Sequence, residues 1–217
     1  GKEGKREKGG QMVKNMDYAI RTYGGTFIHE LFHVIQRKYQ FLMDKFYESR
    51  LYFVKAKEIS NISKIHDIVR ANPDGLEMMW VWDHPEATNP IWVNAVFDII
   101  DNESYRKNKL RKVRYIALPL NRQIKKINKD KNGKKTIIYK HKKYKVIVEK
   151  GQPKVINIED ASEFNHFFRI TNNNYHPNEI TAEYFRIYIL NLIGKYNNQH
   201  IMDGEGMKSF ISMVESI

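Results

Sequence analysis

The sequence predicts an α+β fold in which two helices carry the functional residues and an antiparallel β region separates them along the chain. Apolar residues recur at helical spacing in residues 26–36 and again in residues 178–193, which predicts the two helices. Between them, from residue 113 to 158, β-branched runs alternate with turn-forming residues, a pattern typical of antiparallel strands. The chain has 217 residues, 41% of them hydrophobic, which suffices for one sizeable core, so residues 12–217 are expected to form one domain.

The N-terminal third is expected to be mainly helical. Residues 1–11, GKEGKREKGGQ, are charged and glycine-rich, which indicates a basic disordered leader. A weak helical pattern follows and is expected to stop at Gly24-Gly25, with Thr26 as the N-cap of the next helix. That helix should be largely buried, because its apolar residues cover a broad surface; they are Phe27, Ile28, Leu31, Phe32, Val34 and Ile35. The helical pattern continues to about residue 70 with one break near residues 60–63, and NPDG at 72–75 is typical of a turn.

The rest of the chain alternates between apolar and turn-forming segments. Residues 76–100 contain all three tryptophans and are expected to contribute to the core. The runs VRYIALPL, TIIYK, KYKVIVE and KVINI predict the strands of a basic β insertion at about residues 106–158. Residues 159–170 predict a short helix, a strong helix is expected from Pro177 to near Gly194, and residues 207–217 predict a last helix.

The sequence HELFH, residues 29–33, is the first candidate for a functional site. Residues four apart lie on one face of a helix, so His29 and His33 can direct ring nitrogens at one shared point. The chain has no cysteine, so any metal must be bound by His, Asp or Glu. Glu30 lies about 100° round the helix from His29, where it could take a proton from a water on the metal. The motif therefore predicts a Zn²⁺ site with His29 and His33 as ligands and Glu30 as general base.

A catalytic zinc site needs a third protein ligand and one open position. No histidine follows His33 at a short spacing, so the third ligand is expected from another element. Glu179 and Glu183 lie one turn apart on an otherwise apolar helix, where carboxylates without a partner would be costly to bury, although acidic residues also favour a first helical turn. Glu179 is the preferred third ligand; the alternatives are Glu77, Asp83 and His84.

These segments resemble the gluzincins, zinc metallopeptidases in which His-Glu-x-x-His on one helix is completed by a glutamate on a later helix. NEITAE, residues 178–183, matches the second pattern, and EITAEYF is similar to the corresponding segment of the anthrax lethal factor-like branch. HPNEITAEYF is also similar to segments of predicted metallopeptidases of large DNA viruses and phages. The resemblance covers only two short helical segments of the chain. It implies a zincin-like fold in which His29, His33 and Glu179 bind zinc, and Glu183 orients a ligand histidine.

The chain departs from the gluzincin pattern in two respects. Glu179 follows His33 at a much longer separation than is usual in that family, so the β region would be inserted between the ligands. Gluzincins also place a sheet before the first zinc helix, whereas only 28 residues precede His29. Either the strands of residues 113–158 supply that sheet, or further sequence lies upstream.

Peptide hydrolysis also needs a donor that stabilises the oxyanion as it develops. Tyr175 and His176 directly precede the helix of Glu179 and are the candidate catalytic residues for this role. The lethal factor-like branch places its tyrosine further upstream, where this chain has Asn172.

The net charge of +12 is concentrated in one part of the chain. Residues 106–150 contain 18 Lys or Arg against Asp130 and Glu149, a local charge of +16, so the other residues together carry −4. This segment favours either a solvated β surface or a site for nucleic acid or another anionic partner. Two functions are therefore expected as alternatives: a zinc metallopeptidase acting on a protein or peptide, or a basic nucleic-acid or virion-interaction protein with a structural or vestigial metal site.

No segment has the roughly 18 uninterrupted apolar residues that a membrane-spanning helix requires, and the first residues lack the apolar core of a signal peptide. We therefore expect a soluble protein, with virion association as one option that the viral resemblance raises. The sequence leaves the oligomeric state open.

Overall fold

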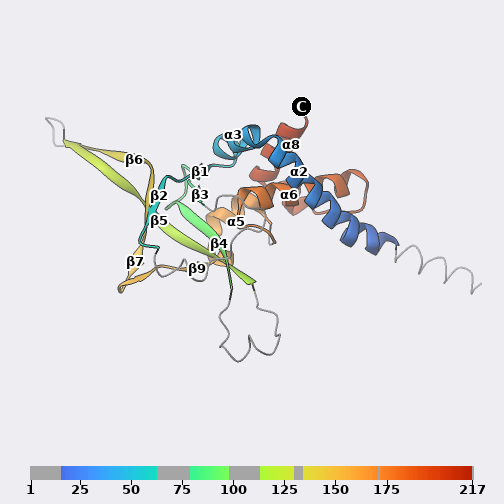
Figure 1. Ribbon diagram of the computed structural model, residues 1–217, viewed down its shortest axis with the longest axis horizontal. Coiled ribbons are helices and arrows are strands. Elements are labelled where there is room, and N and C mark those ends of the chain that lie inside the picture. Colours follow the sequence, from blue (N-terminus) through green and yellow to red (C-terminus); the bar gives the residue numbers. More distant parts are fainter. Residues whose placement is uncertain (1–15, 63–78, 98–112, 130–133, 171, 217) are drawn as a thin grey trace, which may run out of the picture.

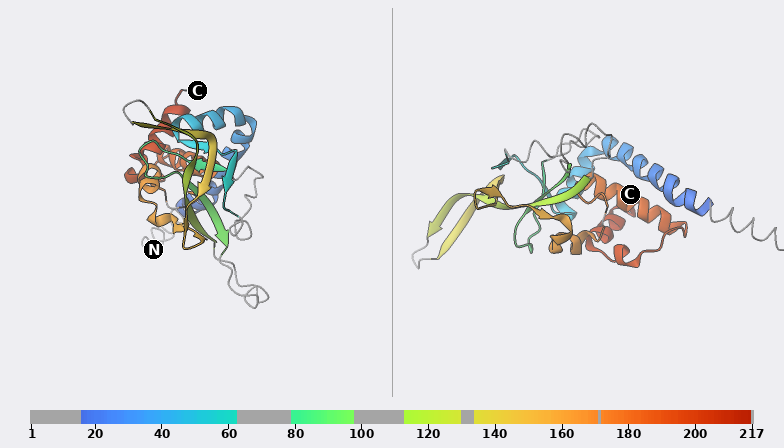
Figure 2. Two further views of the ribbon diagram at one scale, coloured as in Figure 1. Left: turned by 90° about the vertical axis from the view of Figure 1, so that its left-hand side faces the viewer. Right: turned by 90° about the horizontal axis from the view of Figure 1, so that it is seen from below.

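The computed structural model describes residues 16–62, 79–97, 113–129, 134–170 and 172–216. It has a mixed α+β architecture, in which helices gather on one side of a curled sheet and a long β-hairpin projects from the opposite end (Figure 1). The right-hand view of Figure 2 shows the same division into a helical side and a projecting hairpin. The predicted leader at 1–11, the turn at 72–75 and the first part of the β insertion, 106–112, lie outside the described residues.

The helix that carries HELFH begins earlier than expected. The chain is helical from Met16, passes through a π-helical turn, η1 (Ile20–Gly24), and continues directly as α2 (Gly25–Lys38). Gly24 and Gly25 keep right-handed helical φ angles of −63° and −60°, so the predicted stop at these glycines was wrong. Thr26 is not an N-cap, because its hydroxyl donates to the carbonyl oxygen of Thr22 one turn earlier (3.0 Å).

Only one face of α2 is buried, so the expectation of a largely buried helix was wrong. Phe27 is 68% exposed and Val34 is 57% exposed. The buried face is formed by Gly25, His29, Phe32, His33 and Gln36. This face packs against α6 (Pro177–Leu192), which leaves several of the larger apolar side chains on the outer face of α2.

The helical region after α2 is also shorter than expected. α3 (Gln40–Arg50) follows a break at Tyr39, and Tyr52 then adopts a φ of 58°, which a right-handed helix cannot contain. Two short strands follow, β1 (Phe53–Lys55) and β2 (Glu58–Ser60). The prediction of mainly helix to residue 70 was therefore wrong for residues 51–60, and residues 63–70 lie outside the described part of the chain.

The main sheet has the strand order β1-β3-β4-β5-β6-β2 in the part of the chain that the structure describes, with β9 paired to β5. Its remaining strands are β3 (Trp80–Trp82), β4 (Ile91–Phe97), β5 (Val113–Lys129), β6 (Lys135–Val146) and β9 (Ile156–Asn157); β7 (Val148–Glu149) and β8 (Gln152–Pro153) pair separately. Of these pairings, β2 with β6 is parallel and the others are antiparallel. The predicted antiparallel region at 113–158 is confirmed, and the sheet extends back to residue 53.

Apolar cores lie on both faces of the sheet. Because side chains alternate along a strand, Trp80 and Trp82 belong to the core under the helices and Val81 to the opposite core. The helix-side core includes Phe53, Phe164, Phe168, Ile180, Tyr184 and Phe210, and the opposite core includes Trp92, Val96, Ile116, Leu118 and Tyr144. All three tryptophans are buried, as predicted.

The C-terminal helices agree with the prediction. α5 (Ser162–Phe168), α6 and α8 (Glu205–Val214) correspond to the three predicted helices; the 3₁₀ turn η2 (Ile158–Asp160) and the short α7 (Gln199–Met202) are additional. α6 begins with Pro177 and ends two residues before Gly194, whose φ is 68°. Among the described residues, no helix is both long enough and apolar enough to cross a membrane.

Gly206 holds α8 close to α6, which gives a testable prediction of stability. A Cβ atom at Gly206 would lie 2.6 Å from the hydroxyl oxygen of Tyr184, a buried group that donates to the carbonyl oxygen of Phe168 (2.8 Å). Gly206→Ala is therefore expected to lower the free energy of unfolding by about 1–3 kcal/mol. Gly24→Ala is the control, since nothing lies within 4 Å of its Cβ position, and it should be neutral or stabilising. Urea denaturation that ranks the two variants in the opposite order would contradict this packing.

Candidate metal centre

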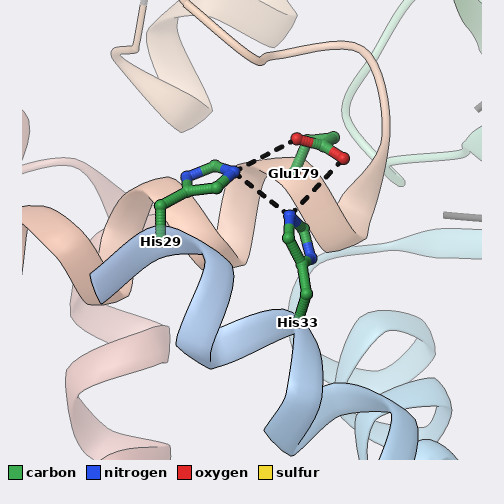
Figure 3. A group of neighbouring side chains, drawn as sticks. All are labelled: His29, His33 and Glu179. Carbon is green, nitrogen blue, oxygen red and sulfur yellow. Dashed lines mark hydrogen bonds and ion pairs between the residues drawn. The ribbon is translucent and has the colours of Figure 1, made fainter. Parts of the chain in front are cut away.

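The predicted ligands His29, His33 and Glu179 lie together between α2 and α6. The two histidines come from the buried face of α2, one helical turn apart, and Glu179 comes from the first turn of α6 (Figure 3). All three residues are buried, with exposed fractions of 7%, 3% and 6%. His33 and Glu179 are far apart in the sequence but close in space, because α6 packs directly against α2.

The distances between the candidate ligand atoms suit a small tetrahedral ion. The Nε2 atoms of His29 and His33 are 3.1 Å apart, and His29 Nε2 lies 3.3 Å from Glu179 Oε2. His33 Nε2 lies 3.7 Å from the other carboxylate oxygen, Oε1. Zinc bonds of about 2.0–2.1 Å in a tetrahedral site place neighbouring ligand atoms about 3.3–3.4 Å apart. The group could therefore hold a metal ion with only small side-chain adjustments.

The hydrogen bonds of Gln36 determine which nitrogen of His33 is available to a metal. The amide nitrogen of Gln36 donates to the carbonyl oxygen of Asn178 (2.8 Å) and to Thr181 Oγ1 (2.8 Å). Its amide oxygen therefore accepts from His33 Nδ1 (2.7 Å). With its proton on Nδ1, His33 presents the lone pair of Nε2 toward His29 and Glu179. Gln36 thus orients His33 and also ties α2 to the first turn of α6.

Glu183 faces the other nitrogen of His29. Its Oε2 lies 3.6 Å from His29 Nδ1, an electrostatic contact across the helix interface. Arg186 fixes this carboxylate, since its Nε donates to Glu183 Oε2 (2.9 Å) and its Nη2 donates to Oε1. A carboxylate beside Nδ1 favours a proton there, which would leave Nε2 of His29 available to a metal ion. Glu183 therefore lies beside the ring nitrogen of His29 that does not face Glu179.

The electrostatics of the group favour positive charge at its centre. Burial lowers the pKa of His29, but the carboxylates of Glu179 and Glu183 outweigh it and raise this pKa to about 9. Burial raises the pKa of Glu179, but the bond to His29 and the charge of His33 bring it below its ordinary value. Three electron-pair donors converge here, and a shared proton or a metal cation can relieve their repulsion. The two imidazole nitrogens and the carboxylate are therefore chemically suited to bind a cation.

The group lies on the wall of an open cavity of about 560 Å³. Glu30 lines the same cavity and is exposed, so its carboxylate is accessible to water and substrate. Tyr175 also lines it, with its ring stacked on Tyr115 of β5 at a centroid distance of 5.2 Å. Asn172 is part of the lining as well. The structure therefore brings the predicted base and one predicted oxyanion donor to the same cavity as the ligands.

His176 occupies a different position from Tyr175. It is the N-cap of α6, where its Nδ1 accepts from the backbone N–H of Asn178 (3.2 Å), and it is 2% exposed. It is not among the residues that line the cavity. Burial raises the pKa of Glu179, whereas His29, His33 and, with the smallest effect, His176 lower it.

The alternative third ligands do not approach the two histidines. Asp83 forms an ion pair with Arg122 and accepts from the hydroxyl of Tyr144 (2.8 Å), on the sheet. His84 stacks on Trp82 with a centroid distance of 5.4 Å, in a separate cavity. Glu77 lies outside the described residues. Within the described part of the chain, Glu179 is therefore the carboxylate that completes the group.

The sequence interpretation missed four residues that support the site: Gln36, Tyr115, Thr181 and Arg186. Gln36 follows His33 by three positions, so helical spacing alone could have placed it on the ligand face. Arg186 follows Glu183 by three positions and could have been found in the same way. Tyr115 carries no such signal, because only the fold brings β5 to the cavity.

No protein-family model, curated protein or solved structure matches this chain.

Proposed function

We propose that this protein is a zinc-dependent metallopeptidase of the zincin-like type. One observation carries the proposal: the three candidate ligands and Glu30 line one open cavity, so a metal held there would be accessible to substrate. A structural zinc site has four protein ligands and is closed, whereas a catalytic site has three and keeps a position open. The resemblance of HELFH and NEITAE to the gluzincin motifs supports the same conclusion.

Each residue has a specific role in this proposal. His29, His33 and Glu179 would hold the zinc, which supplies the positive charge that polarises the substrate carbonyl and acidifies water. Glu30 takes the proton of the attacking water on its carboxylate and transfers it to the departing amine. Tyr175, held by its stack on Tyr115, donates its hydroxyl proton in a hydrogen bond to the developing oxyanion. Gln36 and Glu183 keep the two histidines in the orientation that the ligand role needs.

Removal of the metal tests the proposal. The purified protein should cleave an unfolded protein substrate such as casein in the presence of zinc. Treatment with 1,10-phenanthroline should abolish cleavage, and added zinc should restore it, because in this proposal the metal supplies the charge that polarises the substrate carbonyl and acidifies the water. Cleavage that persists after complete removal of the metal would assign the activity to another site or a contaminant.

Metal binding is expected to release a proton from His29 at neutral pH. In the metal-free protein, the pKa of His29 is about 9, above the ordinary value of 6.5, so the protonated form stabilises the fold. This stabilisation is complete below pH 6.5 and is lost as the pH rises through about 9. At pH 7.5 a metal ion must therefore displace this proton.

Calorimetric titration with zinc in buffers of different ionisation enthalpy measures this release. The observed heat should depend on the buffer at pH 7.5, with about one proton released per ion, and the dependence should fall as the pH approaches 9 to 10. A heat of binding that is independent of the buffer at pH 7.5 would show that His29 is already neutral.

A further inference from the structure

The β-hairpin that projects from the sheet forms a second surface, far from the metal centre. We define the β arm as residues 123–129 of β5 together with residue 134 and residues 135–141 of β6. β5 pairs with β4 only as far as Pro119, and β6 pairs with β2 only from Lys143, so the β arm is a ribbon of two strands. Figure 1 and the right-hand view of Figure 2 place it at the end of the molecule opposite α2 and α6. A two-stranded ribbon without a core is marginal in water, which indicates that it has a partner.

The charged side chains of the β arm are all positive. Its basic residues are Lys125, Lys126, Lys129, Lys134, Lys135 and Lys140, and these two segments contain no Asp or Glu, although Asp130 lies between them in the sequence. Lys129 and Lys135 lie directly opposite each other in the strand register, an arrangement that costs free energy. At the base of this hairpin, Lys142 forms an ion pair with Glu48 and Lys143 forms one with Glu58. A polyanionic partner would relieve this repulsion along the whole arm.

One face of the β arm also carries a row of apolar residues. Ile127 lies opposite Ile137, and Ile124 lies opposite Tyr139. The irregular register near Ile124 brings these two pairs to the same face, because side chains alternate along each strand. Their exposed fractions are 44–50%, so each of these apolar side chains is about half accessible to solvent. The partner therefore offers apolar surface between its negative charges.

We propose that the β arm binds double-stranded DNA in the major groove. That groove is about 12 Å wide and admits a two-stranded β-ribbon, whose lysines can reach the phosphates on both sides. The apolar row would face the base edges, where thymine methyl groups accept isoleucine contacts. Lys129, Lys134 and Lys135 lie at the far end of the described strands, and charged side chains there disfavour insertion into a membrane. The deep, narrow major groove of an RNA duplex would exclude the arm.

The test compares two variants that lose the same charge at different places. The arm variant is Lys125→Gln, Lys126→Gln, Lys129→Gln and Lys135→Gln. The control variant is Lys38→Gln, Lys45→Gln, Lys57→Gln and Lys208→Gln. All eight lysines are exposed, so both variants should fold as the parent does, which circular dichroism can check. Fluorescence anisotropy of a labelled DNA duplex of about 20 base pairs then measures binding at several salt concentrations.

The arm variant should lose at least about tenfold in affinity for the DNA duplex, and its slope of log K against log salt should be shallower by up to about 3–4. The control variant should lose less than about threefold, and an RNA duplex should bind the parent at least about tenfold more weakly. Equal losses in the two variants would overturn the proposal. So would binding of the RNA duplex, polyglutamate or anionic phosphatidylserine vesicles that is as strong as binding of the DNA.

This inference does not depend on the proposed peptidase activity. Glu179→Ala, which removes a candidate zinc ligand, should bind the DNA duplex as the parent does, because Glu179 lies between α2 and α6 and not on the β arm. The failure of one proposal therefore leaves the other unchanged.

Discussion

Glu30→Gln is expected to lower the rate of peptide hydrolysis by about 10²- to 10⁴-fold while leaving zinc bound. Glutamine keeps the size and polarity of the side chain but cannot accept a proton at neutral pH. Glu30 lines the cavity beside the ligands yet is exposed and does not belong to the buried ligand group, so the metal should be retained. The variant therefore separates a catalytic metal site from one that only binds a metal.

The comparison requires both activity and metal content. Rates of cleavage of a quenched fluorescent peptide should be measured together with zinc content by mass spectrometry. Glu215→Gln, at an exposed position at the end of α8, is the matched control and should behave as the parent does. Hydrolysis by Glu30→Gln at the parental rate would remove Glu30 from the mechanism, and a loss of zinc together with activity would make it a metal-binding residue instead.

Glu179→Ala should weaken zinc binding by more than about a hundredfold. Loss of a residue that merely orients a ligand already costs about 10- to 100-fold in affinity, and Glu179 is assigned as a ligand itself. Its removal also takes away the carboxylate that lies 3.3 Å from His29 Nε2, so less negative charge faces the metal. Competition with a chromogenic chelator measures the affinity.

Two further variants test whether the loss of zinc affinity is specific to the ligand role of Glu179. Glu179→Gln keeps the volume of the side chain and should show nearly the same loss as Glu179→Ala, which separates loss of a ligand from loss of folding. Glu183→Gln should cost only about 10- to 100-fold, because Glu183 contacts His29 Nδ1 and not the proposed metal position. Equal affinities across the three variants and the parent would place the third ligand elsewhere.

The part of the site that follows from local spacing could be predicted from the sequence. His29 and His33 share a helix face because they are four residues apart, and Glu179 and Glu183 do so for the same reason. The start of α6 at Pro177 and its end before Gly194 also follow from local rules. These features depend only on neighbours in the sequence, and the structure contains all of them.

Other features depend on tertiary contacts, which a local pattern does not encode. The predicted N-cap at Thr26 assumed that two glycines stop a helix, whereas packing close to Arg186 and Leu190 keeps Gly25 within α2. The apolar residues of α2 predicted which of its faces is buried. In the structure, the face that carries the histidines is buried instead, because it contacts the charged and polar groups of α6. The strands β1 and β2 are too short to show a clear alternation, and a left-handed residue at Tyr52 separates them from α3.

The most direct test of the metal centre is anomalous diffraction from crystals grown with zinc, recorded on both sides of the zinc absorption edge. We expect one strong anomalous peak per chain between α2 and α6, about 2.0–2.2 Å from His29 Nε2, His33 Nε2 and a carboxylate oxygen of Glu179. A peak bound by other residues, or no peak at these three in zinc-saturated crystals, would contradict it.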